Sequence, residues 1–149
     1  MEDTLLEVRD LQVEFSTKMG SVRVLDKVNL KVDPRQTVGI IGESGCGKSM
    51  MALSIMGLVP IPPGRIAGGE ILYRGTDLLT LGKDAILDIR GKRIAMIFQE
   101  PMNSLNPVFT VGNQLVETLL RHEDMTRRDA WDKSVDMLKA VGIPSPEKR

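Results

Sequence analysis

Residues 42–49 carry the sequence GESGCGKS, in which glycines, a lysine and a serine stand at the spacing G-x-x-x-x-G-K-[ST]. Glycines let the backbone turn tightly and bring successive amide N–H groups close to an anion without an intervening Cβ. Lys48 adds a positive charge for the outer phosphates of a nucleotide, and the Ser49 hydroxyl is suited to hold Mg²⁺. The spacing therefore predicts a loop that binds the phosphates of a nucleotide.

The segments on either side of this loop are those that a phosphate-binding loop requires. Residues 37–41 (TVGII) form a short, uncharged, β-branched run, which is typical of a buried parallel strand. Residues 49–56 are apolar on nearly every side and predict a buried helix that Gly57 and Pro60 end. Such a helix points its positive end at the anion. A chance glycine-rich turn, the alternative, does not account for this strand–loop–helix order.

The composition of the chain limits its function classes. The 149 residues suffice for one domain or a large part of one, and 20 basic residues balance 20 acidic ones, so neither nucleic acid nor an anionic membrane is an expected partner. Cys46 is the one cysteine, which excludes an internal disulfide and fits a reducing compartment. The acidic beginning is unlike a signal peptide, and the longest uncharged stretch, residues 49–64, is too short and proline-rich to span a membrane. We expect membrane contact only through a partner.

The first 36 residues predict an antiparallel β layer ahead of the loop. Apolar and polar residues alternate over residues 6–15 and again over residues 28–32, with residues 16–21 as a hairpin connection. Many P-loop kinases and small GTPases place the loop on their first strand instead. A β layer before the loop therefore narrows the class of P-loop protein to which the chain can belong.

Two strands and a short helix are expected between the loop and Gln99. Residues 60–69 are rich in proline and glycine and predict a connection, followed by a strand at residues 70–73. Residues 83–90 have apolar residues at helical spacing. Residues 93–98 (RIAMIF) predict a second buried strand that delivers Gln99 at its C-terminal end, where ligands bind in open α/β sheets.

The last third of the chain predicts two helices. The first has one apolar stripe, made of Val111, Leu115, Leu119 and Leu120. The second begins at Thr126, which with Asp129 resembles a capping box, and ends at Gly142 and Pro144. One face of this second helix carries Trp131, Val135, Leu138 and Val141.

The loop, the β layer before it and the residues around Gln99 together resemble the N-terminal half of an ABC transporter nucleotide-binding domain. Residues 96–107 (MIFQEPMNSLNP) are the sharper marker and resemble the Q-loop region of ATPase subunits in the oligopeptide/dipeptide permease group, which imports peptides and nickel. Residues 42–49 and residues 73–79 (YRGTDLL) are also similar to that group. The resemblance runs from about Leu6 to the last residue.

The resemblance implies an α/β fold: a P-loop NTPase core of ABC type with an N-terminal antiparallel β subdomain and the start of a helical subdomain, the C-terminal half of the domain being absent. It implies a β subdomain at residues 1–36, the P-loop core up to the Q-loop at residues 37–100, and part of the helical subdomain at residues 101–149. The implied function is that of an ATP-binding subunit of an importer, which couples ATP binding and hydrolysis to uptake of peptides or a related solute such as nickel.

Partners and location follow from the same resemblance. The implied partners are a second nucleotide-binding subunit, transmembrane permease subunits and a separate substrate-binding protein, without nucleic acid and without direct membrane insertion. The implied location is the cytoplasmic face of the inner or plasma membrane, where the protein is peripheral through the permease subunits.

The resemblance implies ATP and Mg²⁺ as cofactors. It also implies roles for individual residues at the positions that match the family's motifs. Lys48 and Gln99 are implied to be catalytic, and Ser49 and Gln99 to contact the metal. Phe15 stands where the family places the aromatic residue that stacks on adenine; the alternative is that Phe15 is a core aromatic residue. For Gln99, the alternative is a polar residue at a strand end whose hydrogen bonds are satisfied within the protein. The implied nucleotide-binding residues are Phe15, Gly42, Glu43, Ser44, Gly45, Cys46, Gly47, Lys48, Ser49 and Met50.

The chain also departs from the family pattern, because it reaches Arg149 before the signature motif, the second carboxylate motif, the D-loop and the switch histidine. Glu100 is interpreted as a solvated or loop-anchoring acid and not as the catalytic base. We therefore expect the 149-residue chain to bind nucleotide without turning it over. The alternatives are a nucleotide-binding interaction or remnant protein without catalysis, and a P-loop kinase, against which the early β layer argues.

Three further residue types are interpreted as structural. Cys46 lies at a helix N-terminus, which lowers the pKa of a thiol, but a small residue simply fits there. His122, the only histidine, is interpreted as a solvated helix end that cannot form a metal cluster alone. Arg127 and Arg128 are interpreted as charges on a helix surface.

Overall fold

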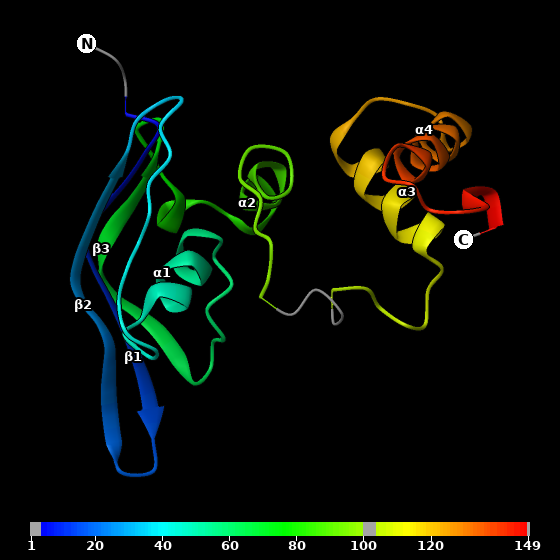
Figure 1. Ribbon diagram of the computed structural model, residues 1–149. Coiled ribbons are helices and arrows are strands. Elements are labelled where there is room, and N and C mark those ends of the chain that lie inside the picture. Colours follow the sequence, from blue (N-terminus) through cyan, green and yellow to red (C-terminus); the bar gives the residue numbers. More distant parts are fainter. Residues whose placement is uncertain (1–3, 100–103, 149) are drawn as a thin grey trace. The chain divides into compact units, whose positions relative to one another are not determined.

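The computed structural model describes residues 4–99 and 104–148, which divide into two compact units, Met1–Leu87 and Asp88–Arg149 (Figure 1). The elements along the chain are β1 (Leu6–Thr17), β2 (Gly20–Val32), α1 (Lys48–Ile55), β3 (Gly64–Tyr73), β4 (Thr76–Asp77), η1 (Leu78–Thr80), α2 (Lys83–Ile89), α3 (Val111–His122), α4 (Arg127–Ala140) and η3 (Pro146–Lys148).

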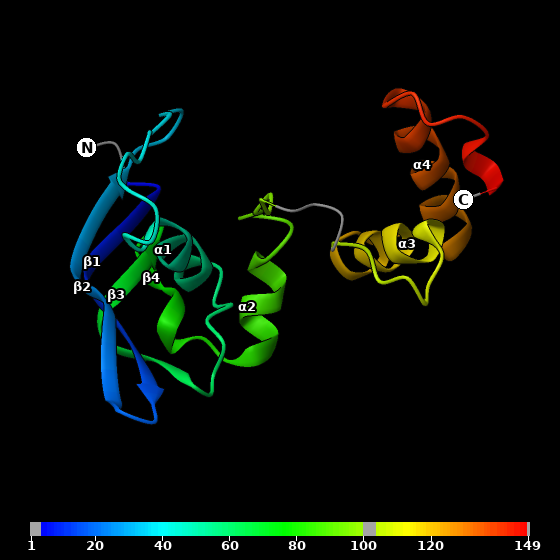
Figure 2. The same ribbon diagram turned by 60° about the horizontal axis from the view of Figure 1, so that its bottom comes forward.

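The first unit is built on an antiparallel sheet with the strand order β2-β1-β3-β4. The three long strands contribute Val8, Leu11, Val13, Leu25 and Ile71 to its core, and Met51, Met56, Val59 and Leu78 are buried as well. Figures 1 and 2 show α1 lying against one face of this sheet. The β layer predicted for the first 36 residues is therefore confirmed, with β3 as a further strand beside β1.

A bulge in β1 explains the interrupted alternation of its sequence. The register shifts between Val8 and Leu11, and Asp10 adopts a left-handed φ of 45°. The Asp10 amide donates to the side-chain oxygen of Asn29 on β2 at 2.9 Å, which fixes the irregular backbone. An extra residue in one strand turns the following side chains over. Val8, Leu11 and Val13 consequently all reach the core, although they are not evenly spaced.

Two predicted buried strands are absent from the described structure, and those predictions are wrong. Residues 37–41 have no strand hydrogen bonding, and the side chains of Ile40 and Ile41 are 47% and 99% exposed. Residues 93–98 make a single isolated bridge, Arg90 with Ile94, and Ile97 is 94% exposed. A β-branched run becomes a buried strand only when neighbouring strands take its amide and carbonyl groups. Among the described residues, none pairs with either segment in this way.

Smaller differences concern the bounds of elements. β3 begins at Gly64, so more than half of the predicted connection at residues 60–69 is strand. The hairpin between β1 and β2 is tighter than predicted, because Thr17 already pairs with Gly20. The predicted helices after the phosphate loop and at residues 83–90 are confirmed as α1 and α2.

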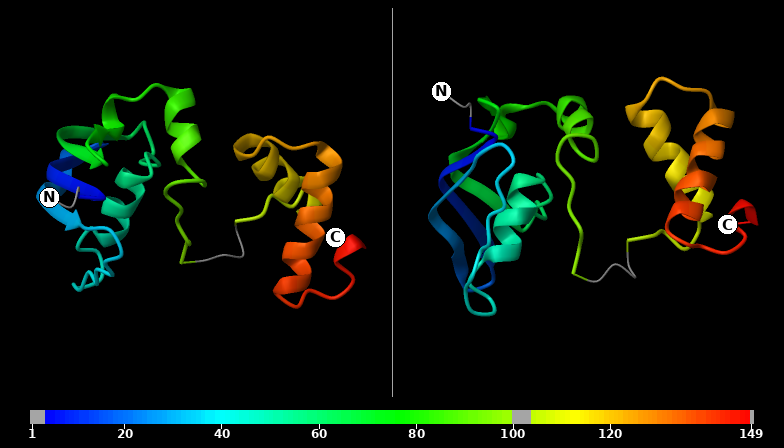
Figure 3. Two further views of the ribbon diagram at one scale, coloured as in Figure 1. Left: turned by 90° about the horizontal axis from the view of Figure 1, so that it is seen from above. Right: turned by 45° about the horizontal axis from the view of Figure 1, so that its top comes forward.

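The second unit contains α3 and α4, which pack side by side (Figure 3). The predicted capping box at the start of α4 is confirmed: the Thr126 hydroxyl accepts from the Asp129 amide at 3.2 Å, and the Asp129 carboxylate accepts from the Thr126 amide at 3.3 Å. The helix ends before Gly142, whose φ is 78°. The buried side of α4 is formed by Ala130 and Ser134, whereas Trp131 on the predicted apolar face is 36% exposed.

None of the helices in the described part of the chain combines the length and the apolar character needed to cross a membrane.

Candidate functional site

The loop at residues 42–49 is shaped by glycines that serve two different purposes. Gly45 has a φ of 82° with open space where a Cβ would stand, so its backbone conformation accounts for the glycine. At Gly42 a Cβ would lie 2.7 Å from Cys46 Sγ, and at Gly47 it would lie 2.6 Å from Leu25 Cδ2. These two glycines permit close packing. Gly47 thus lets the loop pack on β2, and Gly42 leaves room for the Cys46 thiol within the loop.

Lys48 folds back over this loop. Its ammonium donates to the carbonyl oxygens of Gly42 at 2.7 Å and Glu43 at 2.6 Å, and its Nζ lies 3.3 Å from Cys46 Sγ. The positive charge is thus held by the backbone of the loop that it belongs to. Because carbonyl oxygens are neutral acceptors, a phosphate oxygen that reaches the ammonium forms a stronger, charge-assisted hydrogen bond.

Cys46 is exposed, and the hydrogen bond from the Lys48 ammonium lowers the pKa of its thiol below the ordinary value. This is the direction that its place at a helix N-terminus predicts. Desolvation works against the shift. The thiol therefore takes part in the contacts of the Lys48 ammonium, in addition to fitting over Gly42.

Helix α1 contributes its positive end to the same place. Gly47 is the N-cap residue with a left-handed φ of 98°, and its carbonyl accepts from the Met51 amide at 2.9 Å. The amides before Met51 belong to the first turn, where backbone N–H groups have no intrahelical acceptor. Ser49 is exposed and Met50 half-buried in this turn. The first turn therefore offers amide donors and a hydroxyl beside Lys48.

A cavity of about 210 Å³ lies beside the loop. Its lining residues are Leu25, Val28, Ile40, Ile41, Cys46, Gly47, Lys48 and Met51. Leu25 and Val28 on β2 were predicted only as strand residues, because nothing in their local pattern shows that the loop packs on them. The apolar run at residues 37–41 was a stronger signal of residues that lie beside the loop, because it leads directly into residues 42–49.

Phe15 lies near the end of β1, where it pairs with Val22 on β2 and Gly64 on β3. It is half-buried, and a Cβ on Gly64 would stand 3.0 Å from the tip of its ring. Phe15 belongs to the same unit as the loop but does not line the cavity beside Lys48. Its role as an adenine platform stays a prediction.

Gln99 is exposed and belongs to the unit Asp88–Arg149, whereas Lys48 and Ser49 belong to Met1–Leu87. The geometry described for the loop therefore contains no group from Gln99, and its contact with a metal stays a prediction. Glu100 lies outside the described residues. Among the residues that are described, no three His, Cys, Asp or Glu side chains gather as a metal site.

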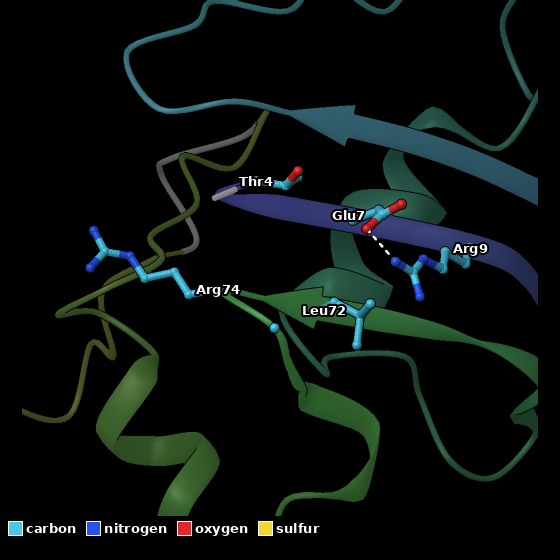
Figure 4. Close-up of a pocket in the computed structure, with 6 residues that line it drawn as sticks. Thr4, Glu7, Arg9, Leu72 and Arg74 are labelled. Atoms are coloured by element: carbon cyan, nitrogen blue, oxygen red, sulfur yellow. Dashed lines mark hydrogen bonds and ion pairs between the residues drawn. The ribbon is translucent and has the colours of Figure 1, made fainter. Parts of the chain in front are cut away.

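A second cavity, of about 290 Å³, lies on the sheet away from the loop (Figure 4). Its lining residues are Thr4, Glu7, Arg9, Leu72, Arg74 and Gly75. Figure 4 shows the side chains of Glu7 and Arg9 turned toward each other, and the two groups are 2.7 Å apart. Arg9 also meets Glu70 at 3.4 Å. Carboxylates therefore already neutralise the Arg9 guanidinium in this cavity.

Comparisons with known proteins identify the family of the chain. The family model "ABC transporter" matches residues 25–149. The oligopeptide transport ATP-binding protein OppD of Bacillus subtilis (strain 168) is 48% identical over 145 residues, which cover 97% of this chain and 40% of that protein. The dipeptide transport ATP-binding protein DppD of Haemophilus influenzae is 44% identical, over 97% of this chain and 44% of that protein. The chain thus spans less than half the length of these relatives.

Solved structures show the same fold. A structure described as the dimeric structure of MJ0796, a bacterial ABC transporter cassette, matches with a TM-score of 0.73 at 24% identity, over 90% of this chain and 56% of that chain. A post-hydrolysis state of the same cassette, bound to ADP and Pi, matches with a TM-score of 0.68 at 22% identity. The fold is accordingly the α/β ABC cassette with its antiparallel β subdomain. With a family model that matches from Leu25 to the last residue, the chain belongs to the ABC transporter family.

Proposed function

We propose that the chain binds Mg-ATP through residues 42–49 as the nucleotide-binding part of an ABC importer subunit. The observation that carries the proposal is the position of the Lys48 ammonium, held over a glycine loop at the positive end of α1. The similarity to oligopeptide and dipeptide transport ATP-binding proteins supports it.

The residues of the loop fit a nucleotide. The space around Gly45 is open, and the amides of residues 45–49 are suited to receive phosphate oxygens. Lys48 would hold the outer phosphates, and the Ser49 hydroxyl together with phosphate oxygens would hold Mg²⁺. When bound, the metal neutralises charge that develops on the phosphates. The remaining loop residues (Gly42, Glu43, Ser44, Cys46, Gly47 and Met50) would shape the cradle through their backbone.

Two residues outside the loop complete the proposed site. Phe15, half-buried and adjacent to Gly64, would offer its ring to adenine. Gln99, exposed in the second unit, would contact the metal and the attacking water in the complete subunit. We propose the domain boundaries predicted from the sequence as well: a β subdomain at residues 1–36, the core at residues 37–100 and helical subdomain at residues 101–149.

We further propose that the complete subunit hydrolyses ATP to drive import of peptides or a related solute such as nickel. Its partners would be a second nucleotide-binding subunit, permease subunits in the membrane and a separate substrate-binding protein. It would lie at the cytoplasmic face of the inner or plasma membrane. The 149-residue chain alone would not turn ATP over, because the lining of the cavity beside Lys48 includes no carboxylate.

Titration calorimetry with Mg-ATP tests the proposal. The Lys48→Ala variant should lose most of the binding and keep the circular dichroism spectrum of the parent chain, because the ammonium contacts only its own loop. Lys31→Ala is the matched control: this exposed lysine on β2 pairs with Asp33 at 3.3 Å and should leave the affinity unchanged. Equal affinity of the parent and the Lys48 variant would contradict the proposal.

A further inference from the structure

Three residues of the first unit lie opposite one another on neighbouring strands of the sheet. Phe15 on β1 pairs with Val22 on β2 and with Gly64 on β3. Residues that are directly opposite in antiparallel strands share one face of the sheet. Val22 is 52% exposed, and Phe15 is half-buried. The ring of Phe15 therefore belongs to a partly open row whose position on β3 carries no side chain.

Gly64 is surrounded too closely to carry a side chain. Its backbone does not have the left-handed φ that favours glycine, so conformation does not account for this residue. A Cβ would stand 2.7 Å from the Pro60 carbonyl oxygen, 2.9 Å from Val59 Cγ1 and 3.0 Å from Phe15 Cζ. Glycine within a strand commonly marks such a close approach. Space is therefore the reason for this glycine, and the tip of the Phe15 ring is one of the three groups that fill the space.

The turn before β3 is tied to the strand that carries the ring. The Gly64 amide donates to the Pro60 carbonyl at 2.8 Å, which closes the turn. The amide of Ser16, the residue after Phe15, donates to the Pro63 carbonyl at 3.0 Å. Backbone groups held in this way move less readily than a side chain that is half-buried. Of the three groups around Gly64, the Phe15 ring is therefore the one that a side chain at this position would displace.

Helix α1 connects this turn to the phosphate loop. The helix begins at Lys48 and ends at Ile55. Beyond its end, the Leu58 amide still donates to the Leu53 carbonyl at 2.7 Å, and the next residue, Val59, is buried. One short stretch of chain, residues 48–64, thus begins with the proposed phosphate contacts and ends with the glycine on which the Phe15 ring lies.

We propose that Gly64 is a positioning residue for the base of the nucleotide. Because it has no side chain, the Phe15 ring lies over the start of β3 in the place where it stacks on adenine. Gly64 acts through Phe15 and does not itself contact the nucleotide. This inference rests on the proposed function, in which residues 42–49 bind the phosphates and Phe15 stacks on adenine. A methyl group at position 64 displaces the ring and removes part of the stacking, while the phosphate contacts remain.

Titration calorimetry of the 149-residue chain with Mg-ATP and with Mg-tripolyphosphate, which has no base, tests the role of Gly64. Gly64→Ala should weaken Mg-ATP about threefold or more, a part of the stacking contribution, and leave the affinity for Mg-tripolyphosphate unchanged. Gly68→Ala is the matched control on the same strand: its φ is not left-handed either, and its Cβ would stand 3.9 Å from Gln12, an ordinary contact. Equal weakening of both ligands by Gly64→Ala would contradict the proposal.

The same substitution in a chain without the ring separates positioning from damage to the turn. In the Phe15→Ala background, Gly64→Ala should cause no further loss of Mg-ATP affinity, because the ring through which Gly64 acts is gone. A further loss equal to that seen in the parent chain would assign the effect to the turn at residues 60–64 and contradict the proposal.

NMR of the parent chain provides a measurement that needs no folded variant. With Mg-ATP bound, the protons of the Phe15 ring should show nuclear Overhauser contacts both to the Gly64 Hα protons and to the adenine protons. Contacts to adenine without any contact to Gly64 would overturn the proposal.

The two ligands also separate this inference from the proposed function. Lys48→Ala should weaken both Mg-ATP and Mg-tripolyphosphate, because the ammonium is expected to hold phosphates. If neither ligand binds the parent chain, the proposed function fails and the role of Gly64 fails with it. If Mg-ATP binds in a Lys48-dependent manner and Gly64→Ala binds it as tightly as Gly68→Ala, the proposed function stands and the role of Gly64 is wrong.

Discussion

In the first unit, the side chains expected to bind nucleotide differ from those that stabilise the sheet. Lys48 uses its ammonium within its own loop, so its removal costs little of the fold. Glu14, in contrast, contributes to the stability of the sheet. Its carboxylate is 11% exposed and accepts from Arg23 on β2 and Arg65 on β3, which joins all three long strands. A carboxylate with such partners is costly to leave unpaired.

Replacement of Phe15 by alanine tests the proposed adenine platform. The loss of base stacking should weaken Mg-ATP binding by about 1 kcal/mol or somewhat more. ADP should be weakened equally, because it carries the same adenine. Phe109→Ala is a matched control, since Phe109 is 58% exposed and lies in the other unit. An unchanged affinity of a folded Phe15 variant in calorimetry would return this ring to a purely structural role.

The Glu14 network predicts a pH dependence of stability. The hydrogen bond from Arg23, together with the charge of Arg65, lowers the pKa of the Glu14 carboxyl below its ordinary value of 4.5. Its contribution is therefore complete above the pKa of the unfolded chain and is lost as the pH falls through the lower pKa of the folded state. Glu14→Gln should lower the urea midpoint at about pH 7 and reduce the loss of stability toward about pH 3.

Glu70→Gln provides the comparison for this experiment. Glu70 meets Arg9 at 3.4 Å and is 53% exposed, so its removal should change the urea midpoint little at any pH. Parallel pH curves of the parent and the Glu14 variant would contradict the assigned role of Glu14.

At the scale of elements, the sequence predicted those helices and turns that are determined by residues close together in the chain. The helices α1, α2 and α4 and the β1–β2 hairpin follow from local periodicity, caps and turns. The strands predicted at residues 37–41 and 93–98 failed because burial of a strand depends on partners that local composition cannot reveal. For the same reason the loop was predictable from its spacing, while its packing on Leu25 and the approach of Cys46 Sγ to Lys48 were not.

The capping box of α4 gives a prediction at this scale. Thr126→Ala removes the hydroxyl that accepts from the Asp129 amide and should destabilise the second unit by about 1 kcal/mol. Thr118→Ala is the matched control, because the Thr118 hydroxyl donates to the Gln114 carbonyl inside α3 and caps no helix. Alanine favours helix interiors, so this variant should be neutral or slightly stabilising. Chemical unfolding followed by circular dichroism measures both; equal losses would contradict the cap assignment.

Both units expose large apolar side chains. Ile41 and Ile97 are almost fully exposed, and Val108 is 82% exposed. Residues 37–41 also leave backbone donors and acceptors without a strand partner among the described residues. Exposed apolar segments with free strand edges favour association.

Turnover is the property that belongs to the molecule as a whole. The loop supplies Lys48 and Ser49, but the cavity beside it is lined without a carboxylate, and Gln99 lies in the other unit. Loss of one positioned catalytic group typically costs a factor of about a hundred or more. Steady-state ATP hydrolysis by the purified 149-residue chain should therefore equal that of Lys48→Ala, the background control, in a phosphate-release assay. Robust hydrolysis that disappears in Lys48→Ala would contradict this expectation. Its loss in Glu100→Gln as well would then identify Glu100 as the working acid.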